Sequence, residues 1–236
     1  MKELVEYILK GLAGYVPLLV SIVAAPKRTV SKLTTGEPDS LRKAMIFAGF
    51  TIALAFVFQA PLVPDGQDFV KVAGSLLVLK IIAYLTFAGL MLAAFRLVGG
   101  KGDYLTTLCA CLYITSPVYL FQIVTHILNL GIISTYDPAF ATIWNTNLSF
   151  NQQQIQDFIK LAPGAAIAVS AILVFQLLIS VIWFLICWGV YRTIHQVSRV
   201  KSAFVYLITT GLWYSYWWLT VLAMKGLYGG VQFPMG

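Results

Sequence analysis

Residues 164–191 read GAAIAVSAILVFQLLISVIWFLICWGVY and contain no charged side chain. An α-helix rises about 1.5 Å per residue, and the hydrocarbon core of a bilayer is about 30 Å thick. About 20 consecutive apolar residues are therefore enough to cross it. This stretch exceeds that length, so it predicts a membrane-spanning helix.

Four more apolar stretches accompany it, at residues 42–60, 72–98, 104–133 and 202–225. The chain of 236 residues is 59% hydrophobic and 11% charged, whereas soluble globular proteins average about 45–50% and about 25%. This composition excludes a water-soluble fold. The sequence predicts an all-α membrane protein, a five-transmembrane-helix bundle.

The chain divides into three predicted parts, which are an interfacial amphipathic N-terminal segment at 1–40, a five-helix transmembrane domain at 41–228 and a short outer C-terminal tail at 229–236. In the first part, apolar residues recur at helical spacing opposite Lys2, Glu6 and Lys10, as in a helix that lies in a membrane interface. A half-inserted hairpin is the alternative. A cleaved signal peptide is disfavoured because Pro17 interrupts the apolar run and Glu6 stands in the basic region.

Lysine and arginine follow the positive-inside pattern when the N-terminus is placed inside. The outer segments then hold only Lys71, Lys160 and Lys225, and the inner segments hold Lys2, Lys10, Lys27, Arg28, Lys32, Arg42, Lys43, Arg96, Lys101, Arg192, Arg199 and Lys201. We therefore expect a cytoplasmic N-terminus and an outside C-terminus. A bacterial inner membrane is the expected location, with a eukaryotic endomembrane as the alternative. Because the basic residues share no solvated face, we expect no nucleic-acid partner.

The connections between the apolar stretches carry two motifs. The turn before the third stretch is Gly99-Gly100-Lys101-Gly102, with Tyr113 and Pro117 farther along that stretch. The junction between the fourth and fifth stretches, residues 189–203, reads GVYRTIHQVSRVKSA. A weaker third motif, Ala25-Pro26-Lys27-Arg28, precedes the first stretch.

Over about residues 25–220, these motifs resemble the Yip family, the Ypt-interacting proteins. The resemblance implies five membrane spans and an inner N-terminus, which agrees with the orientation expected from the charges. It resembles a compact bacterial-type member, because the long cytosolic N-terminal region of eukaryotic members, with its Asp-Leu-Tyr-Gly-Pro motif, is missing. A Rab-type GTPase partner is therefore not implied.

Polar residues within the apolar stretches form a candidate intramembrane site, which comprises Lys80, Gln122, His126, Asn129 and Gln176. Lys80 lies about 13 Å into its span, as judged by the helical rise from Lys71. Such residues either hold helices together through hydrogen bonds or line a substrate or proton path. A second candidate surface is the cytoplasmic basic loop of Arg192, His195, Arg199 and Lys201, which we expect to contact anionic lipid, or a partner by resemblance.

The sequence contains no sign of a catalytic centre within the apolar stretches, because nucleophile–His–acid sets, paired carboxylates and metal-ligand clusters are lacking there. We expect no enzyme activity and no cofactor. Cys109, Cys111 and Cys187 predict neither a disulfide framework nor a metal site.

Two functions are open at this stage. The first is a non-catalytic Yip-type protein that organises the membrane or recruits partners through its basic cytoplasmic face. The alternative is a small transporter or channel for an anionic solute or lipid headgroup, with Lys80 and His126 in its path. Expected partners are anionic membrane lipids, an unidentified protein and a second copy of the chain, since Gly89 and Ala93 recur at the four-residue spacing of close helix contacts.

Overall fold

The computed structural model describes residues 2–35, 37–62, 69–146 and 152–227, and every regular element in that part is helical. Five long helices make up the body of the molecule, namely α3 (Pro38–Gln59), α4 (Phe69–Leu97), α5 (Tyr104–Tyr136), α8 (Pro163–His195) and α9 (Arg199–Leu227). Other elements join or flank them, namely α1 (Lys2–Ala24), α2 (Pro26–Leu33), the 3₁₀ turn η1 (Ala60–Leu62), α6 (Pro138–Thr146) and α7 (Gln152–Leu161). The predicted tail at residues 229–236 lies outside the described residues.

Four of these helices are long and apolar enough to cross a membrane, namely α3, α4 from Ala73, α5 and α8. This finding confirms the all-helical character and is compatible with an integral membrane protein. The fifth predicted stretch does form a long helix, α9, but α9 is not among these four. Its tryptophan and tyrosine side chains have polar tips, which makes the helix less uniformly apolar than α8. The count of five spans therefore stays a prediction.

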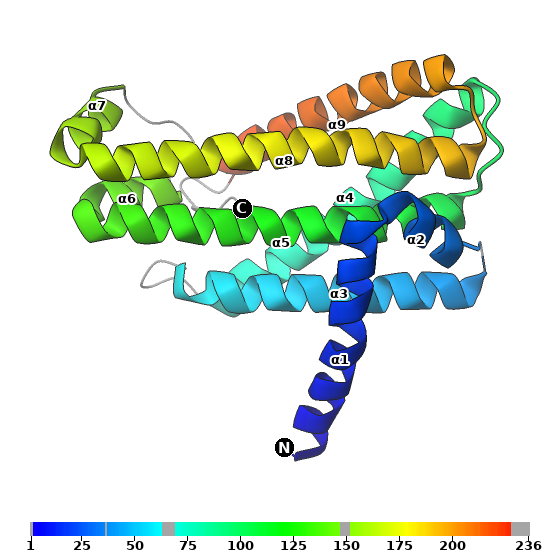
Figure 1. Cartoon of the computed structure of the whole chain (residues 1–236), viewed down its shortest axis with the longest axis horizontal. Helices are drawn as coiled ribbons and strands as arrows, with labels where there is room; N and C mark the ends of the chain where they lie inside the picture. The colour runs from blue at the N-terminus through cyan, green and yellow to red at the C-terminus, as the bar shows by residue number, and fades with distance from the viewer. Residues whose placement is uncertain (1, 36, 63–68, 147–151, 228–236) are drawn as a thin grey trace.

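Helix α5 forms the centre of the bundle, with α3, α4 and α8 packed around it and α9 against α4 and α8 (Figure 1). The buried core follows from this arrangement. Tyr113 of α5 has no exposed surface and its ring lies 5.4 Å from that of Phe47 on α3. The Trp183 indole of α8 donates a hydrogen bond of 3.0 Å to the Ile114 carbonyl of α5.

That hydrogen bond lies beside Pro117, which α5 accommodates without ending. Proline has no backbone N–H, so the carbonyl of Tyr113 loses its usual helical donor and the backbone there is weakened. Hydroxyl groups on the same turn bond to nearby carbonyls, Thr115 to Cys111 and Ser116 to Leu112. The Trp183 bond thus secures α5 to α8 close to the weakest part of the central helix.

Most of the basic residues described in the bundle gather at one end, which we call the basic end. It contains α2, the start of α3, the α4–α5 turn and the α8–α9 junction, whereas α6 and α7 lie at the opposite end (Figure 1). The short helix α7 ends at Leu161, just before Pro163 begins α8. The segments after α1 that the charge pattern predicts to be inner therefore lie together at one end of the bundle.

Helix α1 confirms that the first residues are helical, but its course differs from that of the bundle helices. It crosses α3 with its N-terminal part extending away from the bundle (Figure 1). The contact is made by the Tyr15 hydroxyl, 2.9 Å from the Thr51 hydroxyl, past the midpoint of α3. The side chains of residues 2–10 lie outside the description, so an interfacial position for α1 stays a prediction.

Candidate functional site

The turn between α4 and α5 closes with the hydrogen bonds of a Schellman motif. Gly99 N–H donates to the Arg96 carbonyl at 3.0 Å, and Gly100 N–H donates to the Phe95 carbonyl at 2.8 Å. Gly99 has a φ of 89°, a conformation that favours glycine because it has no Cβ. The backbone conformation of this turn therefore favours glycine at position 99 of the predicted motif.

The same turn contacts the α8–α9 junction through His195. Lys101 N–H donates to the His195 carbonyl at 2.9 Å, and the His195 ring stacks on that of Phe95 with centroids 4.5 Å apart. A Cβ on Gly102 would lie only 2.6 Å from Nδ1 of His195, so the ring needs a glycine there. The two main stretches of the Yip resemblance are thus packed against each other.

The first turn of α5 is capped by Asp103, whose carboxylate accepts from the Thr106 N–H at 2.8 Å and from the Thr106 hydroxyl at 2.8 Å. Partial burial alone would raise the pKa of this carboxyl, but these bonds to the charged form lower it. The Nε2 atom of His195 lies 3.2 Å from the Thr107 hydroxyl on the same turn. Capping and packing therefore fix the turn together.

The predicted basic loop is divided by this packing. His195 is fully buried, whereas Arg199 and Lys201 are exposed and Arg192 is partly buried. Stacking on Phe95 and the close approach of Gly102 remove the imidazole from the surface. His195 is therefore a structural contact, and only the arginines and the lysine of this loop can meet lipid or a partner.

A groove of about 740 Å³ lies at the basic end, and we call it the α2 groove. Its walls come from the end of α1, from α2 and from α8, and the lining residues are Val23, Ala24, Ala25, Pro26, Lys27, Arg28, Ser31, Lys32, Ile186, Gly189 and Thr193. A bend at Ala25 opens the groove because Pro26 begins a new helix. The Thr29 hydroxyl holds this bend with a bond of 2.9 Å to the Ser21 carbonyl.

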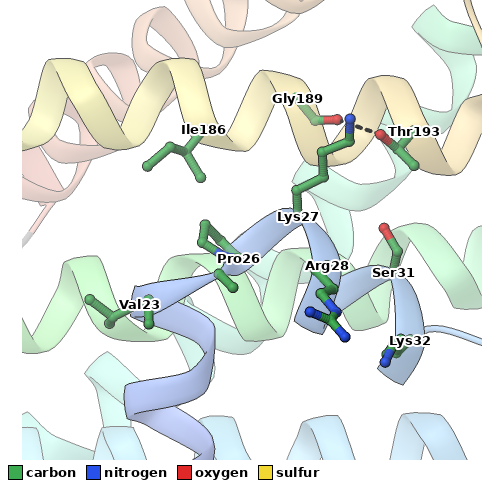
Figure 2. Close-up of a pocket in the computed structure, with 11 residues that line it drawn as sticks. Val23, Pro26, Lys27, Arg28, Ser31, Lys32, Ile186, Gly189 and Thr193 are labelled. Atoms are coloured by element: carbon green, nitrogen blue, oxygen red, sulfur yellow. Dashed lines mark hydrogen bonds between the residues drawn. The ribbon is translucent and has the colours of Figure 1, made fainter.

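The α2 groove combines an apolar wall with a basic rim. Figure 2 shows Lys27 extending from α2 toward Gly189 and Thr193 on α8, while Arg28 and Lys32 point away from α8. The Thr193 hydroxyl donates to the Gly189 carbonyl at 2.9 Å, so these two polar groups of the α8 wall are hydrogen-bonded to each other. The Ser31 hydroxyl is buried and has no hydrogen-bond partner among the described residues.

The charges of the groove differ from those on neighbouring α3. Asp39 pairs with both basic residues of the first turns of α3, at 2.9 Å from Arg42 and 2.6 Å from Lys43. Within the described part of the chain, these are the ion pairs found, and neither involves Lys27, Arg28 or Lys32. The rim of the α2 groove therefore keeps its positive charge.

A separate cavity of about 360 Å³ lies within the bundle, and we call it the Lys80 cavity. Lys80 and Gln122, two of the five predicted polar residues, line it. The Lys80 Nζ atom lies 3.7 Å from the centroid of the Tyr119 ring, a cation–π contact. This contact lets the ammonium be retained between helices, where an isolated charge would be costly.

The other three predicted polar residues do not line the Lys80 cavity. His126 has its Nε2 atom 3.4 Å from the Asn145 amide oxygen of α6, and Asn129 is 2% exposed. Gln176 is partly buried, and its carbonyl accepts from the Ser180 hydroxyl at 2.7 Å. Helical spacing placed Gln122, His126 and Asn129 along one face of α5, but neighbouring helices separate them into different surroundings.

Comparisons of this chain with protein-family models, with curated proteins and with solved structures found no match. The Yip resemblance therefore stays a prediction from the sequence motifs. Sequence reasoning also missed the α2 groove as a site. The available signal was Ala25-Pro26 followed by Lys27 and Arg28, a helix break with adjacent charges, but the facing wall on α8 cannot be read from it.

Proposed function

We propose that this chain is a non-catalytic integral membrane protein of the Yip type, which binds anionic phospholipid at its basic end. The observation that carries the proposal is the α2 groove, with an apolar wall and a basic rim whose lysines and arginine form no ion pair with the described residues. A phospholipid has this same division between an acyl chain and a charged phosphate. The groove fits that division better than it fits a fully polar ligand.

The position of each group supports this assignment. Lys27 and the buried Ser31 hydroxyl lie where a phosphate could receive hydrogen bonds, and Arg28 and Lys32 add positive charge at the rim. Val23 and Ile186 provide apolar surface for the first carbons of an acyl chain. A basic residue near an anionic lipid surface contributes about 1 kcal/mol to binding.

The Yip assignment is supported by the sequence motifs and by the contact between the Gly99–Gly102 turn and His195. In this proposal the basic end faces the cytoplasm of a bacterial inner membrane, and α9 is the fifth span. Lipid gathered at the basic end, together with the exposed Arg199 and Lys201, would form the surface that recruits a protein partner.

The proposed orientation predicts that the two chain ends lie on opposite sides of the membrane. A reporter enzyme that is active only in the cytoplasm should work at the N-terminus and fail at the C-terminus. A reporter that is active only outside should give the reverse pattern. Both ends in one compartment would exclude five spans and, with them, the Yip-type topology.

The lipid site predicts a selective effect of its rim charges. Replacing Lys27, Arg28 and Lys32 together by glutamine should weaken phosphatidylglycerol binding about 100-fold, because three contributions of about 1 kcal/mol are lost. Native mass spectrometry of the protein in detergent, titrated with phosphatidylglycerol and with phosphatidylcholine of the same chains, measures this. Phosphatidylcholine binding should change little.

Two control variants make the experiment specific to the groove. Replacing Lys101, Arg199 and Lys201 by glutamine removes the same charge from exposed positions outside the groove, and should leave most of the binding. Gly189→Leu keeps every charge but fills the groove, where a Cβ meets no atom within 4 Å. Equal loss in both charge variants, or unchanged binding in Gly189→Leu, would contradict the proposal.

A further inference from the structure

The Lys80 cavity is built by two pairs of consecutive helices, α4 with α5 and α8 with α9. Its lining residues are Lys80, Ala83, Tyr84 and Phe87 of α4, Ile114, Thr115, Val118, Tyr119 and Gln122 of α5, Ser180, Trp183, Phe184, Cys187 and Tyr191 of α8, and Tyr206, Thr210, Trp213 and Tyr214 of α9. A volume of about 360 Å³ lies within the range of small-molecule sites. The cavity is thus large enough for a compact organic ligand.

The electrostatic character of the cavity is set by one residue. Lys80 is the charged member of the lining, and none of the lining residues is acidic. An ammonium has three N–H donors, so the Lys80 ammonium can hold a ligand oxygen in addition to its contact with the Tyr119 ring. A single cation in an apolar setting favours a ligand with a single negative charge.

Besides Lys80, the lining carries neutral polar groups, namely Ser and Thr hydroxyls, one carboxamide, and the phenol and indole groups of its tyrosines and tryptophans. The Thr115 and Ser180 hydroxyls donate to carbonyls of their own helices, at 2.7 Å each, and so offer only lone pairs to a ligand. Gln122 brings a carboxamide, whose N–H groups can donate to an anion. Apart from Lys80 these groups are neutral, and a single positive charge suits a singly charged carboxylate better than a phosphate, which carries more negative charge.

The remaining walls are mostly aromatic. The Phe87 and Trp213 rings have centroids 5.2 Å apart, and those of Phe184 and Tyr206 are 4.8 Å apart. Aromatic rings in such pairs present large apolar surfaces at fixed positions. They would cover the apolar body of a ligand whose charged end meets Lys80.

We propose that the Lys80 cavity binds a small monocarboxylate with an apolar body, its carboxylate on the Lys80 ammonium and its body between the aromatic rings. The site is distinct from the α2 groove, because the two share no lining residue. It does not depend on the phospholipid proposal. The ligand class follows from one cation, neutral polar groups and mostly aromatic walls.

The test uses the full chain purified in detergent micelles, titrated with octanoate by isothermal calorimetry. Octanol is the neutral probe of the same length. Octanoate should bind, and Lys80→Met should weaken its binding at least tenfold, because a charge-assisted hydrogen bond is removed. Lys71→Met, an exposed lysine on the same helix, should leave octanoate affinity unchanged.

Folding of the variant is checked by its thermal midpoint, which should not fall when a buried charge is replaced by an apolar side chain of similar length. Equal binding of octanol and octanoate, or equal octanoate affinity in Lys80→Met and the unmodified chain, would overturn the proposal. A parallel titration with 3-phenylpropanoate distinguishes two classes of carboxylate ligand, fatty acids and aromatic acids. Tighter octanoate binding indicates a fatty acid, and tighter phenylpropanoate binding indicates an aromatic acid.

The groove variant with Lys27, Arg28 and Lys32 replaced by glutamine separates the two proposals. It should bind octanoate as the unmodified chain does, even if its phospholipid binding is lost. Loss of octanoate binding in this variant would overturn the assignment to the Lys80 cavity. Retained octanoate binding with unchanged phospholipid binding would contradict the lipid proposal alone.

Discussion

Replacing Trp183 by alanine is expected to lower the free energy of unfolding by about 3 kcal/mol, the low end of the range for tryptophan in a core. The side chain is buried and its indole N–H donates to the Ile114 carbonyl, one turn before the break at Pro117. Truncation would leave a void between α5 and α8 and remove that bond. Lipid is as apolar as the core of the protein. The loss of stability therefore comes mainly from lost van der Waals contacts and the lost hydrogen bond, and less from the hydrophobic effect.

Denaturation of the purified protein in mixed micelles with increasing sodium dodecyl sulfate measures this change. Trp183→Phe separates its two causes, since it keeps a ring but removes the donor, and should cost about 1 kcal/mol. Trp188 offers a matched position on the same helix, where the indole bonds to the Ser202 hydroxyl at 3.0 Å and the side chain is only partly buried. An effect of Trp188→Ala as large as that of Trp183→Ala would argue against a special role beside Pro117.

Gly102→Ala is expected to cost about 1–3 kcal/mol, the usual range for overpacking a close contact. The added Cβ would lie 2.6 Å from Nδ1 and 2.8 Å from Cε1 of His195. The ring has little freedom to move, because Phe95 stacks on one side of it. The expected readout is a lower thermal midpoint in detergent. Gly131→Ala on α5 is the control, since its Cβ meets nothing within 4 Å.

The conflict between these two residues can be isolated by a double variant. His195→Ala alone should also destabilise the protein, because it leaves a void against Phe95. When it is combined with Gly102→Ala, the new methyl group gains space, so the double variant should lose less than the sum of the two single changes. A simple sum would show that the Gly102 effect arises elsewhere in the turn.

Two contacts between segments make the basic end a defined surface. The α4–α5 turn and the α8–α9 junction are fixed to each other through Lys101 and His195, and α2 packs on α8 beside them. A lipid or partner that meets the exposed basic residues would therefore meet a rigid arrangement of charges. We expect weakening of the turn to reduce phospholipid binding even where the groove residues are intact.

The sequence by itself determined that the protein is helical and suited to a membrane, because the apolar runs are long and nearly free of charge. It also determined the Gly99–Gly102 turn, since glycine is the residue that readily adopts a positive φ such as that of Gly99. Each of these features is local in the chain, so a reading of neighbouring residues reveals it.

Only the tertiary structure decided which residues share a space. It placed Lys80 with Tyr119 and Gln122, separated His126 from them, and buried His195 away from the basic surface. In a water-soluble helix the apolar stripe identifies the inward face, but in lipid both faces are apolar. The pattern along these helices therefore could not reveal which side of each one meets another helix, and packing made that choice.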